Sequence, residues 1–199
     1  GMADLILVDH DKPARFHLNS KRALRLNYCV NDHVFKLLEK TLDISFHCGA
    51  GASQGQPGGA ERVELRQYLH TLHEIYGYSY RSGSMGLLEY ANSMGHSRVI
   101  VNWPRTPINR SHRVLDAMAC GACLVTGVLP DIPEDKRERN VHYMAFESKE
   151  ELPYLLESLF SENRWQEVAN NSYKLVMENH TWAIRARELR EMLNKELGL

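Results

Sequence analysis

Four polar residues in the middle of the chain have types and a spacing that suit the binding of an anion and a diol: Asn109, His112, Arg113 and Asp116. At about 100° per residue they fall on one side of a predicted helix, opposite its apolar residues. The Arg113 guanidinium can bind a phosphate through two parallel hydrogen bonds. The Asp116 carboxylate, one turn further along, can accept hydrogen bonds from the two hydroxyls of a ribose. The alternative is a surface ion pair three residues apart, which contributes only roughly a few tenths of a kcal/mol.

The elements that flank this helix determine where it presents these side chains. We predict a strand over residues 98–103, a proline-containing loop, the helix over residues 109–119, and a further strand over residues 122–126. A helix that follows a strand has its amino end at the carboxyl edge of the sheet, where free N–H groups and the helix dipole attract an anion. Gly121 then permits a tight turn from the helix into the next strand.

The remaining sequence alternates predicted strands and helices, as in an α/β protein. Further strands are predicted over residues 5–8, 42–48, 76–81 and 141–146, and further helices over residues 31–39, 85–94, 150–160, 162–178 and 181–197, with one more helix that Gly77 ends. The strands are nearly continuous apolar runs, which indicates burial on both faces of a parallel sheet. We therefore predict one Rossmann-like parallel sheet with helices on both faces in residues 41–199, preceded by a strand or strap extension in residues 1–40.

A glycine-rich loop separates the predicted strand at residues 42–48 from the helix that follows it. Its glycines are Gly49, Gly51, Gly55, Gly58 and Gly59. The first three resemble an incomplete dinucleotide fingerprint, with Arg81 placed to meet a 2′-phosphate, so binding of NAD(P) is one hypothesis. A flexible loop without a ligand is another. Arg62 and Arg66 open the following helix, where either could reach a diphosphate or lie on a solvated helix face.

The bulk properties of the 199 residues exclude several classes of protein. A net charge of −1 gives no overall attraction to nucleic acid or to an anionic membrane. No apolar run approaches the roughly 18 residues of a transmembrane helix, and the start of the chain has no signal-peptide pattern. The cysteines are too sparse for a disulfide framework, which favours a cytoplasmic protein.

The cysteine and histidine patterns offer no competing site. Cys120 and Cys123 form a CxxC motif, but it ends a predicted helix, whereas a redox motif opens one. His70 and His73 share a helix with Glu74 without the order of a zinc-binding HExxH motif, and the other histidines are scattered. We therefore predict no bound metal and no resident cofactor.

Several short segments, in order and at similar spacing, resemble GT-B glycosyltransferases, and in particular the family named for the spore-maturation protein CgeB. The most specific is RVLDAMACGA at residues 113–122, which resembles the family segment R-x-[FL]-E-A-x-A-C-G. The other segments are DISF at 43–46, RQYL at 66–69, EYA at 89–91, SRVIVN at 97–102 and HTWAIR at 180–185. The resemblance runs from about residue 28 to the end of the chain.

The resemblance implies the carboxyl-terminal, donor-binding half of such an enzyme, with a UDP- or GDP-sugar as donor substrate and no need for a metal. The donor-binding residues that it implies are Asp116, Arg113, Asn109, Gly49, Gly51, Ser53, Arg66 and Gly121. The catalytic residues stay unassigned.

Two departures separate this chain from the pattern of those enzymes. Asp116 stands where the family usually has glutamate, and Ile108 stands where many GT-B enzymes carry a second glutamate near the leaving phosphate. The residues before Leu42 are also too few to form the acceptor-binding half. Two hypotheses follow. One is a donor-binding half that an acceptor-domain partner chain or an upstream segment completes. The other is a non-catalytic Rossmann-like module that binds a nucleotide or another protein.

Overall fold

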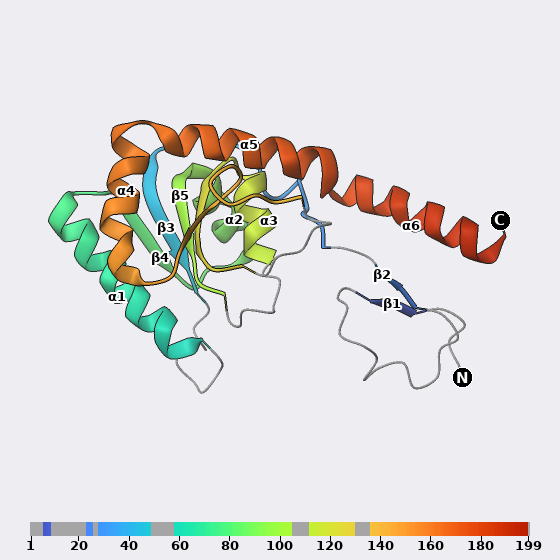
Figure 1. The fold of residues 1–199 in the computed structure, drawn as a ribbon, viewed down its shortest axis with the longest axis horizontal. Coiled ribbons are helices and arrows are strands. Elements are labelled where there is room, and N and C mark those ends of the chain that lie inside the picture. Colours follow the sequence, from blue (N-terminus) through green and yellow to red (C-terminus); the bar gives the residue numbers. More distant parts are fainter. Residues whose placement is uncertain are drawn as a thin grey trace.

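A computed structural model of the chain describes residues 6–8, 23–25, 28–48, 58–104, 112–129 and 136–198. Its centre is a sheet of five strands in the order β4-β3-β5-β6-β7 (Figure 1). The strands are β3 (Leu42–His47), β4 (Tyr80–Gly83), β5 (Ser97–Asn102), β6 (Cys123–Gly127) and β7 (Met144–Phe146). Each neighbouring pair is parallel, so the predicted parallel sheet is confirmed.

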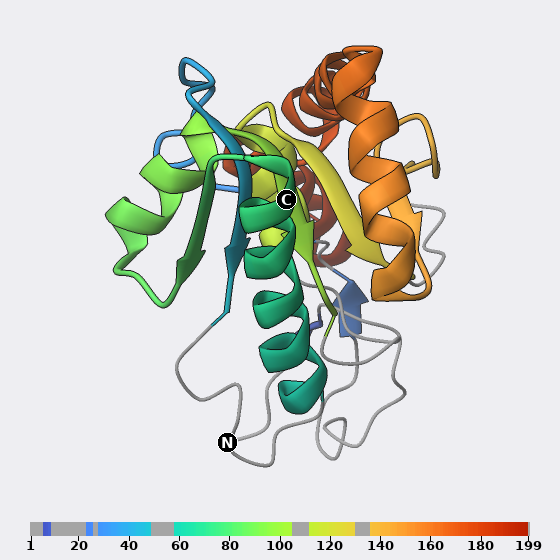
Figure 2. The same ribbon diagram turned by 90° about the vertical axis from the view of Figure 1, so that its left-hand side faces the viewer.

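Helices cover both faces of this sheet, as predicted. On one face lie α1 (Gly59–Tyr76) and α4 (Leu152–Ser161), and on the other lie α2 (Leu87–His96) and α3 (His112–Ala119), as Figure 2 shows from the side. The next helix, α5 (Arg164–Asn179), packs against α3, α4 and β6. The last helix, α6 (Trp182–Leu197), continues from α5 away from the sheet (Figure 1), and a short 3-10 turn, η3 (Lys149–Glu151), leads into α4.

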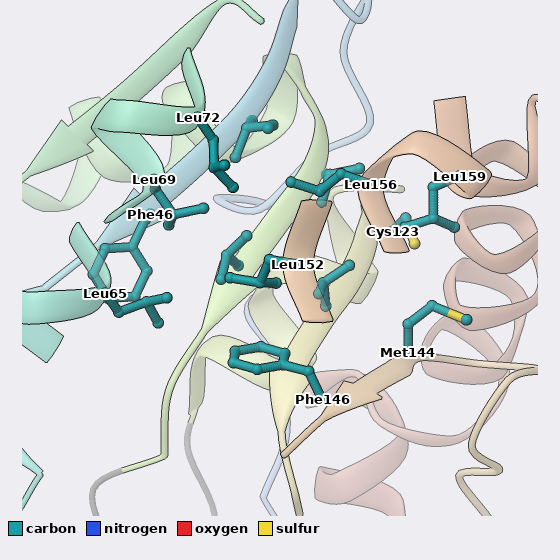
Figure 3. Close-up of a cluster of buried hydrophobic side chains, with 14 of the residues drawn as sticks. Phe46, Leu65, Leu69, Leu72, Cys123, Met144, Phe146, Leu152, Leu156 and Leu159 are labelled. Carbon is teal, nitrogen blue, oxygen red and sulfur yellow. The ribbon is translucent and has the colours of Figure 1, made fainter. Parts of the chain in front are cut away.

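The alternation of side chains along each strand divides the core into two clusters. Val99 and Val101 of β5 pack with α1 and α4, whereas Ile100 between them packs with α2 and α3. Figure 3 shows the first cluster, in which leucines of α1 and α4 meet Phe46 of β3 and Phe146 of β7. Because both faces are covered, β5 and β6 are largely apolar, whereas the edge strand β4 is not. Each fully buried leucine contributes about 1.5–3 kcal/mol.

The segment before the sheet differs from its prediction. Residues 31–39 form a turn and an extended strap, so the predicted helix there is wrong. The Asn31 side chain accepts a hydrogen bond from the His33 N–H at 3.1 Å, which favours the turn over a helix. Val30 pairs with the residue that caps α6, and Phe35 is buried beside α2 and α3. Tertiary contacts along the strap therefore outweigh the local helical pattern.

Smaller differences concern the ends and number of the strands. Gly77, in the left-handed conformation with φ 72°, ends α1, and β4 begins only at Tyr80, later than predicted. The strand expected at residues 5–8 is β1 (Ile6–Val8), which pairs in parallel with an unpredicted strand, β2 (Ala23–Arg25). These two strands form a separate sheet. The division of the chain at residue 40 stays a prediction.

Lys40 joins the carboxyl ends of α2 and α3 at the amino edge of the sheet. Its Nζ donates hydrogen bonds to the carbonyl of Gly95 at 2.8 Å and to that of Cys120 at 2.7 Å. Carbonyls at the end of a helix lack partners within the helix, and the helix dipole makes them favourable acceptors for a cation. Burial lowers the pKa of Lys40 to about 8, so the amine is still mostly charged at neutral pH.

We expect Lys40→Met to lower the free energy of unfolding by about 2 kcal/mol at pH 7, because two part-buried carbonyls lose a charged donor. Urea unfolding followed by circular dichroism measures this change. Lys36→Met, at an exposed position of the same strap, is the control and should change the free energy by less than about 0.5 kcal/mol. Equal effects of the two substitutions would contradict this role of Lys40.

Candidate functional site

Polar side chains gather at the carboxyl edge of the sheet, on the face that α2 and α3 cover. His47 is the last residue of β3, and Asn102, the last of β5, pairs with Thr126 of β6. Asn102 Nδ2 donates to Thr126 Oγ1 at 3.0 Å, whereas its Oδ1 is buried with no hydrogen-bond partner among the described residues. Beside this row β3 leads into α1 on one face and β5 leads into α3 on the other. Sheets of this class bind ligands at such a switch point.

Asp116 enters this region from α3. Every residue of the helix from Val114 to Ala119 is buried, and Asp116 is only 8% exposed. Within the described part of the chain, no donor hydrogen-bonds its carboxylate. Burial raises the pKa of Asp116 to about 7, and the positive charge of Arg113 opposes that rise. The alternative of a solvent-exposed ion pair between Arg113 and Asp116 is therefore wrong.

Arg113, one turn earlier on α3, acts on several neighbouring groups. It is half-buried, and its charge shifts the pKa values of Asp116, Tyr90 and His47. A guanidinium in the first turn of a helix, next to backbone N–H groups, is suited to a phosphate. The structure thus brings Arg113 and Asp116 together, and their role in ligand binding stays a prediction.

His47 and Tyr90 lie beside these two residues, and we call the four side chains the polar cluster. His47 is 4% exposed, and its ring meets that of Tyr90 edge to face, with centroids 5.2 Å apart. Burial lowers the pKa of His47 to about 4, and the charges of Arg113 and Arg81 add to this, so the ring is neutral at physiological pH. Burial raises the pKa of Tyr90, and the charge of Asp116 adds to that shift. The Tyr90 hydroxyl and both His47 nitrogens are buried without hydrogen-bond partners in the described ranges.

The other predicted donor-binding residues of the loops and turns are placed differently. Asn109, Gly49, Gly51 and Ser53 lie outside the described residues. Gly121 lies at the far end of α3, where its φ of 61° makes the turn into β6. A Cβ added to Gly121 would lie 2.4 Å from Leu37 Cδ1, so the tight turn requires glycine. Gly121 therefore supports the site by fixing α3 between its two strands.

The two arginines of α1 lie on the opposite face of the sheet. Arg66 is exposed, and its carbonyl accepts a hydrogen bond from the Tyr80 hydroxyl of β4 at 3.4 Å. Arg62 is buried and donates through Nε and Nη2 to the Trp103 carbonyl at 3.1 and 2.7 Å. A solvated helix face is therefore wrong for Arg62. This side chain ties the start of α1 to the end of β5, and so holds together two connections at the carboxyl edge.

The structure also bears on the competing sites. Burial raises the pKa of Cys120 and of Cys123 to about 12, so neither thiol is a ready redox nucleophile. Arg81 forms an ion pair with Glu89 at 2.6 Å, which engages the charge that a 2′-phosphate would need. Where the structure describes the chain, no three histidine, cysteine or acidic side chains are arranged to hold a metal ion, and none of the helices is long and apolar enough to cross a membrane.

Residues 60–191 match the sequence pattern of the glycosyl transferase-like family. The chain belongs to this family. The match includes α3 with Arg113 and Asp116, and α2 with Tyr90. No curated protein matches the chain in sequence.

Solved structures of glycosyltransferases share the fold of this glycosyl transferase-like chain at low sequence identity. Sucrose-phosphate synthase from Thermosynechococcus elongatus is 15% identical, with a TM-score of 0.60 over 98% of this chain and 59% of that one. Anabaena HepE in complex with UDP-glucose is 12% identical, with a TM-score of 0.64 over 97% of this chain and 64% of that one. The C-terminal domain of a group 1 glycosyl transferase, LpcC, from Francisella tularensis is 13% identical, with a TM-score of 0.54 over 77% of this chain and 99% of that one.

The lengths of these matches show which part of a glycosyltransferase the chain resembles. It spans about three-fifths of the first two proteins but nearly the whole of the isolated C-terminal domain. The glycosyl transferase-like chain therefore has the fold of one GT-B half-domain, the carboxyl-terminal half. The narrower resemblance to the CgeB family stays a prediction.

Sequence reasoning missed His47 and Tyr90 as members of the polar cluster. A signal for His47 exists, because it ends an apolar strand on the face opposite Ile44 and Phe46. A polar residue at the carboxyl end of a buried strand is a candidate for the ligand edge. Tyr90 carries no such signal, since an aromatic residue in an amphipathic helix is normally a core residue.

We expect Asp116→Asn to raise the free energy of unfolding at pH 8 and to leave it nearly unchanged near pH 4. The pKa of Asp116 is raised in the folded chain, so between about pH 4 and pH 7 the folded state keeps a proton that the unfolded state has lost. The carboxylate therefore lowers stability as the pH rises through this window, by at most about 1.4 kcal/mol per pH unit. Urea unfolding of both proteins at pH 4, 6 and 8 measures the difference.

Asp43→Asn is the matched control for this substitution. Asp43 lies at the amino edge of the sheet, where its carboxylate accepts hydrogen bonds from the Ser79 N–H and hydroxyl and pairs with Arg98 at 2.7 Å. Removing that charge should destabilise the chain at pH 8. If Asp116→Asn also destabilises the chain at pH 8, the Asp116 carboxylate has a structural partner and is not an uncompensated buried charge.

Proposed function

We propose that this chain binds a nucleoside diphosphate sugar as the donor-binding half of a glycosyltransferase. The observation that carries the proposal is the buried carboxylate of Asp116 beside Arg113 at the carboxyl edge of the sheet, to which no donor among the described residues hydrogen-bonds. A carboxylate buried without a partner is costly, so its presence favours a ligand that supplies hydrogen-bond donors. A ribose supplies two adjacent hydroxyls, and a diphosphate supplies the negative charge that a guanidinium attracts. HepE, which shares the fold, is solved in complex with UDP and with UDP-glucose.

Transfer of the sugar requires groups beyond the polar cluster. In this proposal the donor half holds the sugar diphosphate in position, and Arg113 neutralises charge that develops on the leaving diphosphate. The nucleotide sugar is a substrate, and the proposal includes no metal or other cofactor. The acceptor-binding half comes from a partner chain or from a segment beyond these 199 residues.

We expect the purified chain to bind UDP or GDP, and the corresponding nucleotide sugars, with a Kd below about 1 mM. Asp116→Asn should weaken that binding by at least about tenfold, because an amide accepts hydrogen bonds from the ribose less strongly than a carboxylate does. Isothermal titration calorimetry at pH 8 measures both values. The same substitution stabilises the free chain, so a loss of binding cannot be attributed to unfolding.

Asp43→Asn serves again as the control, because it lies at the other edge of the sheet and should leave the Kd unchanged. If the wild-type chain binds none of these nucleotides, the proposal is rejected. The hypothesis of a non-catalytic interaction module then remains. Binding without hydrolysis or transfer would support a donor half that needs its acceptor half.

We expect Arg113→Met to weaken binding of a nucleoside diphosphate by about tenfold and to leave binding of the matching nucleoside unchanged, because only the diphosphate contacts the guanidinium. Arg190→Met, on the exposed surface of α6, is the control. Arg66→Met tests the other predicted arginine, which the structure places on the opposite face of the sheet. A comparable loss of nucleoside affinity in Arg113→Met would argue against a phosphate contact.

A further inference from the structure

Two side chains of the polar cluster, Tyr90 and His47, have buried polar atoms without a hydrogen-bond partner among the described residues. These atoms are the Tyr90 hydroxyl and both ring nitrogens of His47. The Arg113 guanidinium lies near the hydroxyl and the Gly83 backbone lies near the ring, but neither forms a hydrogen bond of normal geometry. In native proteins nearly all buried polar groups have a partner. Solvent does not replace that partner, because the hydroxyl and both ring nitrogens are themselves buried. A bound group that offers both donors and acceptors would satisfy them.

The fold holds these groups close together and in fixed orientations. His47 ends β3, Tyr90 lies in the first turns of α2, and Asp116 lies one turn into α3, so the three come from neighbouring elements at one edge of the sheet. The Tyr90 ring is held on two sides, by His47 at 5.2 Å and by Phe35 at 5.8 Å, both edge to face. Packing of the ring therefore positions its hydroxyl.

The chemistry of the three groups selects the kind of ligand atom that fits them. An ionised Asp116 only accepts hydrogen bonds, whereas a phenol and a neutral imidazole each donate one and accept others. Burial, and after it the charges of Arg113 and Arg81, lowers the pKa of His47 and keeps the ring in that neutral form. A phosphate oxygen only accepts and suits Arg113 better than this set. Hydroxyl groups, which donate and accept, match it.

We propose that Tyr90 and His47 bind the ribose hydroxyls alongside Asp116, and that these two side chains make the site selective for ribonucleotides over deoxyribonucleotides. The inference rests on the proposed function, because it assigns further specificity-determining residues to the same donor site. Tyr90 donates to or accepts from one ribose hydroxyl, and His47 does the same with a ribose hydroxyl.

The experiment compares hydroxyl deletions on the protein with hydroxyl deletions on the ligand. Wild type and Tyr90→Phe are titrated with UDP, 2′-deoxy-UDP and 3′-deoxy-UDP, and with the same three forms of GDP. We expect Tyr90→Phe to weaken binding of UDP or GDP by about tenfold. The loss should disappear with the deoxy analogue that lacks the hydroxyl contacted by Tyr90. The phenylalanine keeps the packing against His47 and Phe35, so the free variant should unfold at an unchanged or higher urea concentration.

Tyr80→Phe is the matched control, because it deletes a hydroxyl on the opposite face of the sheet. It should leave all affinities unchanged. His47→Met, which removes both ring nitrogens at similar size, should reduce the preference of the wild type for UDP over at least one deoxy analogue. Its fold is checked by circular dichroism, and Tyr90→Phe provides the same test of a hydroxyl contact without changing the strand.

The outcomes separate this inference from the proposed function. If the wild-type chain binds neither UDP nor GDP, the proposed function itself is rejected. Suppose that the wild-type chain binds, that Asp116→Asn weakens binding and that Tyr90→Phe does not. The donor site then stands, and the inference is overturned. An equal loss in Tyr90→Phe for the ribonucleotide and for both deoxy analogues also overturns it, because the hydroxyl would then act without contacting the ribose.

Discussion

The enclosure of α3 is the constraint on which the candidate site depends. The sheet, α2 and α5 pack around this helix, and all of its residues from Val114 to Ala119 are buried. A carboxylate at position 116 is therefore largely shielded from bulk water. Burial raises the free energy of its ionised form, and no donor among the described residues hydrogen-bonds to it. Arg113 offsets only part of that cost, because its own side chain is half exposed. The local arrangement lowers the stability of the free chain, and in the proposed function a polyhydroxyl, anionic ligand would offset that cost.

The position of this helix depends in turn on contacts at both of its ends. At the amino edge, Gly121 allows the close turn under Leu37, and Lys40 binds the last carbonyls of α2 and α3. At the carboxyl edge, Arg62 binds the Trp103 carbonyl just after β5. All three residues lie outside the polar cluster. They act by fixing the strands and helices that carry it, which is why a residue such as Gly121 matches a family pattern without lying at the ligand edge.

The sequence predicted the parallel sheet, its two-sided helical cover and the position of Arg113 and Asp116 on one helix, because all three depend on local patterns. Apolar runs indicate strands that are buried on both faces, and a helix after a strand has a known direction. The failures have non-local causes. Residues 31–39 have a helical pattern but are drawn into an extended strap by contacts with α2, α3 and the start of α6. Only Arg113 and Asp116 of the polar cluster were predicted from the sequence, because His47 and Tyr90 come from other segments of the chain. Their meeting depends on the register of β3 and on how α2 packs, which no short motif records.

The protonation states of the polar cluster favour binding over proton transfer. His47 is neutral, but a pKa near 4 makes it a weak base. Tyr90 keeps its proton well above neutral pH, because burial and the charge of Asp116 both raise its pKa. Asp116 has a pKa near 7, which alone would suit a general base, yet hydrogen bonds from a ribose would stabilise its ionised form and lower that value. With ligand bound, none of these three side chains is matched to accept a proton from an acceptor hydroxyl. A base for transfer would therefore come from outside the polar cluster, as expected for a donor half that works with an acceptor half.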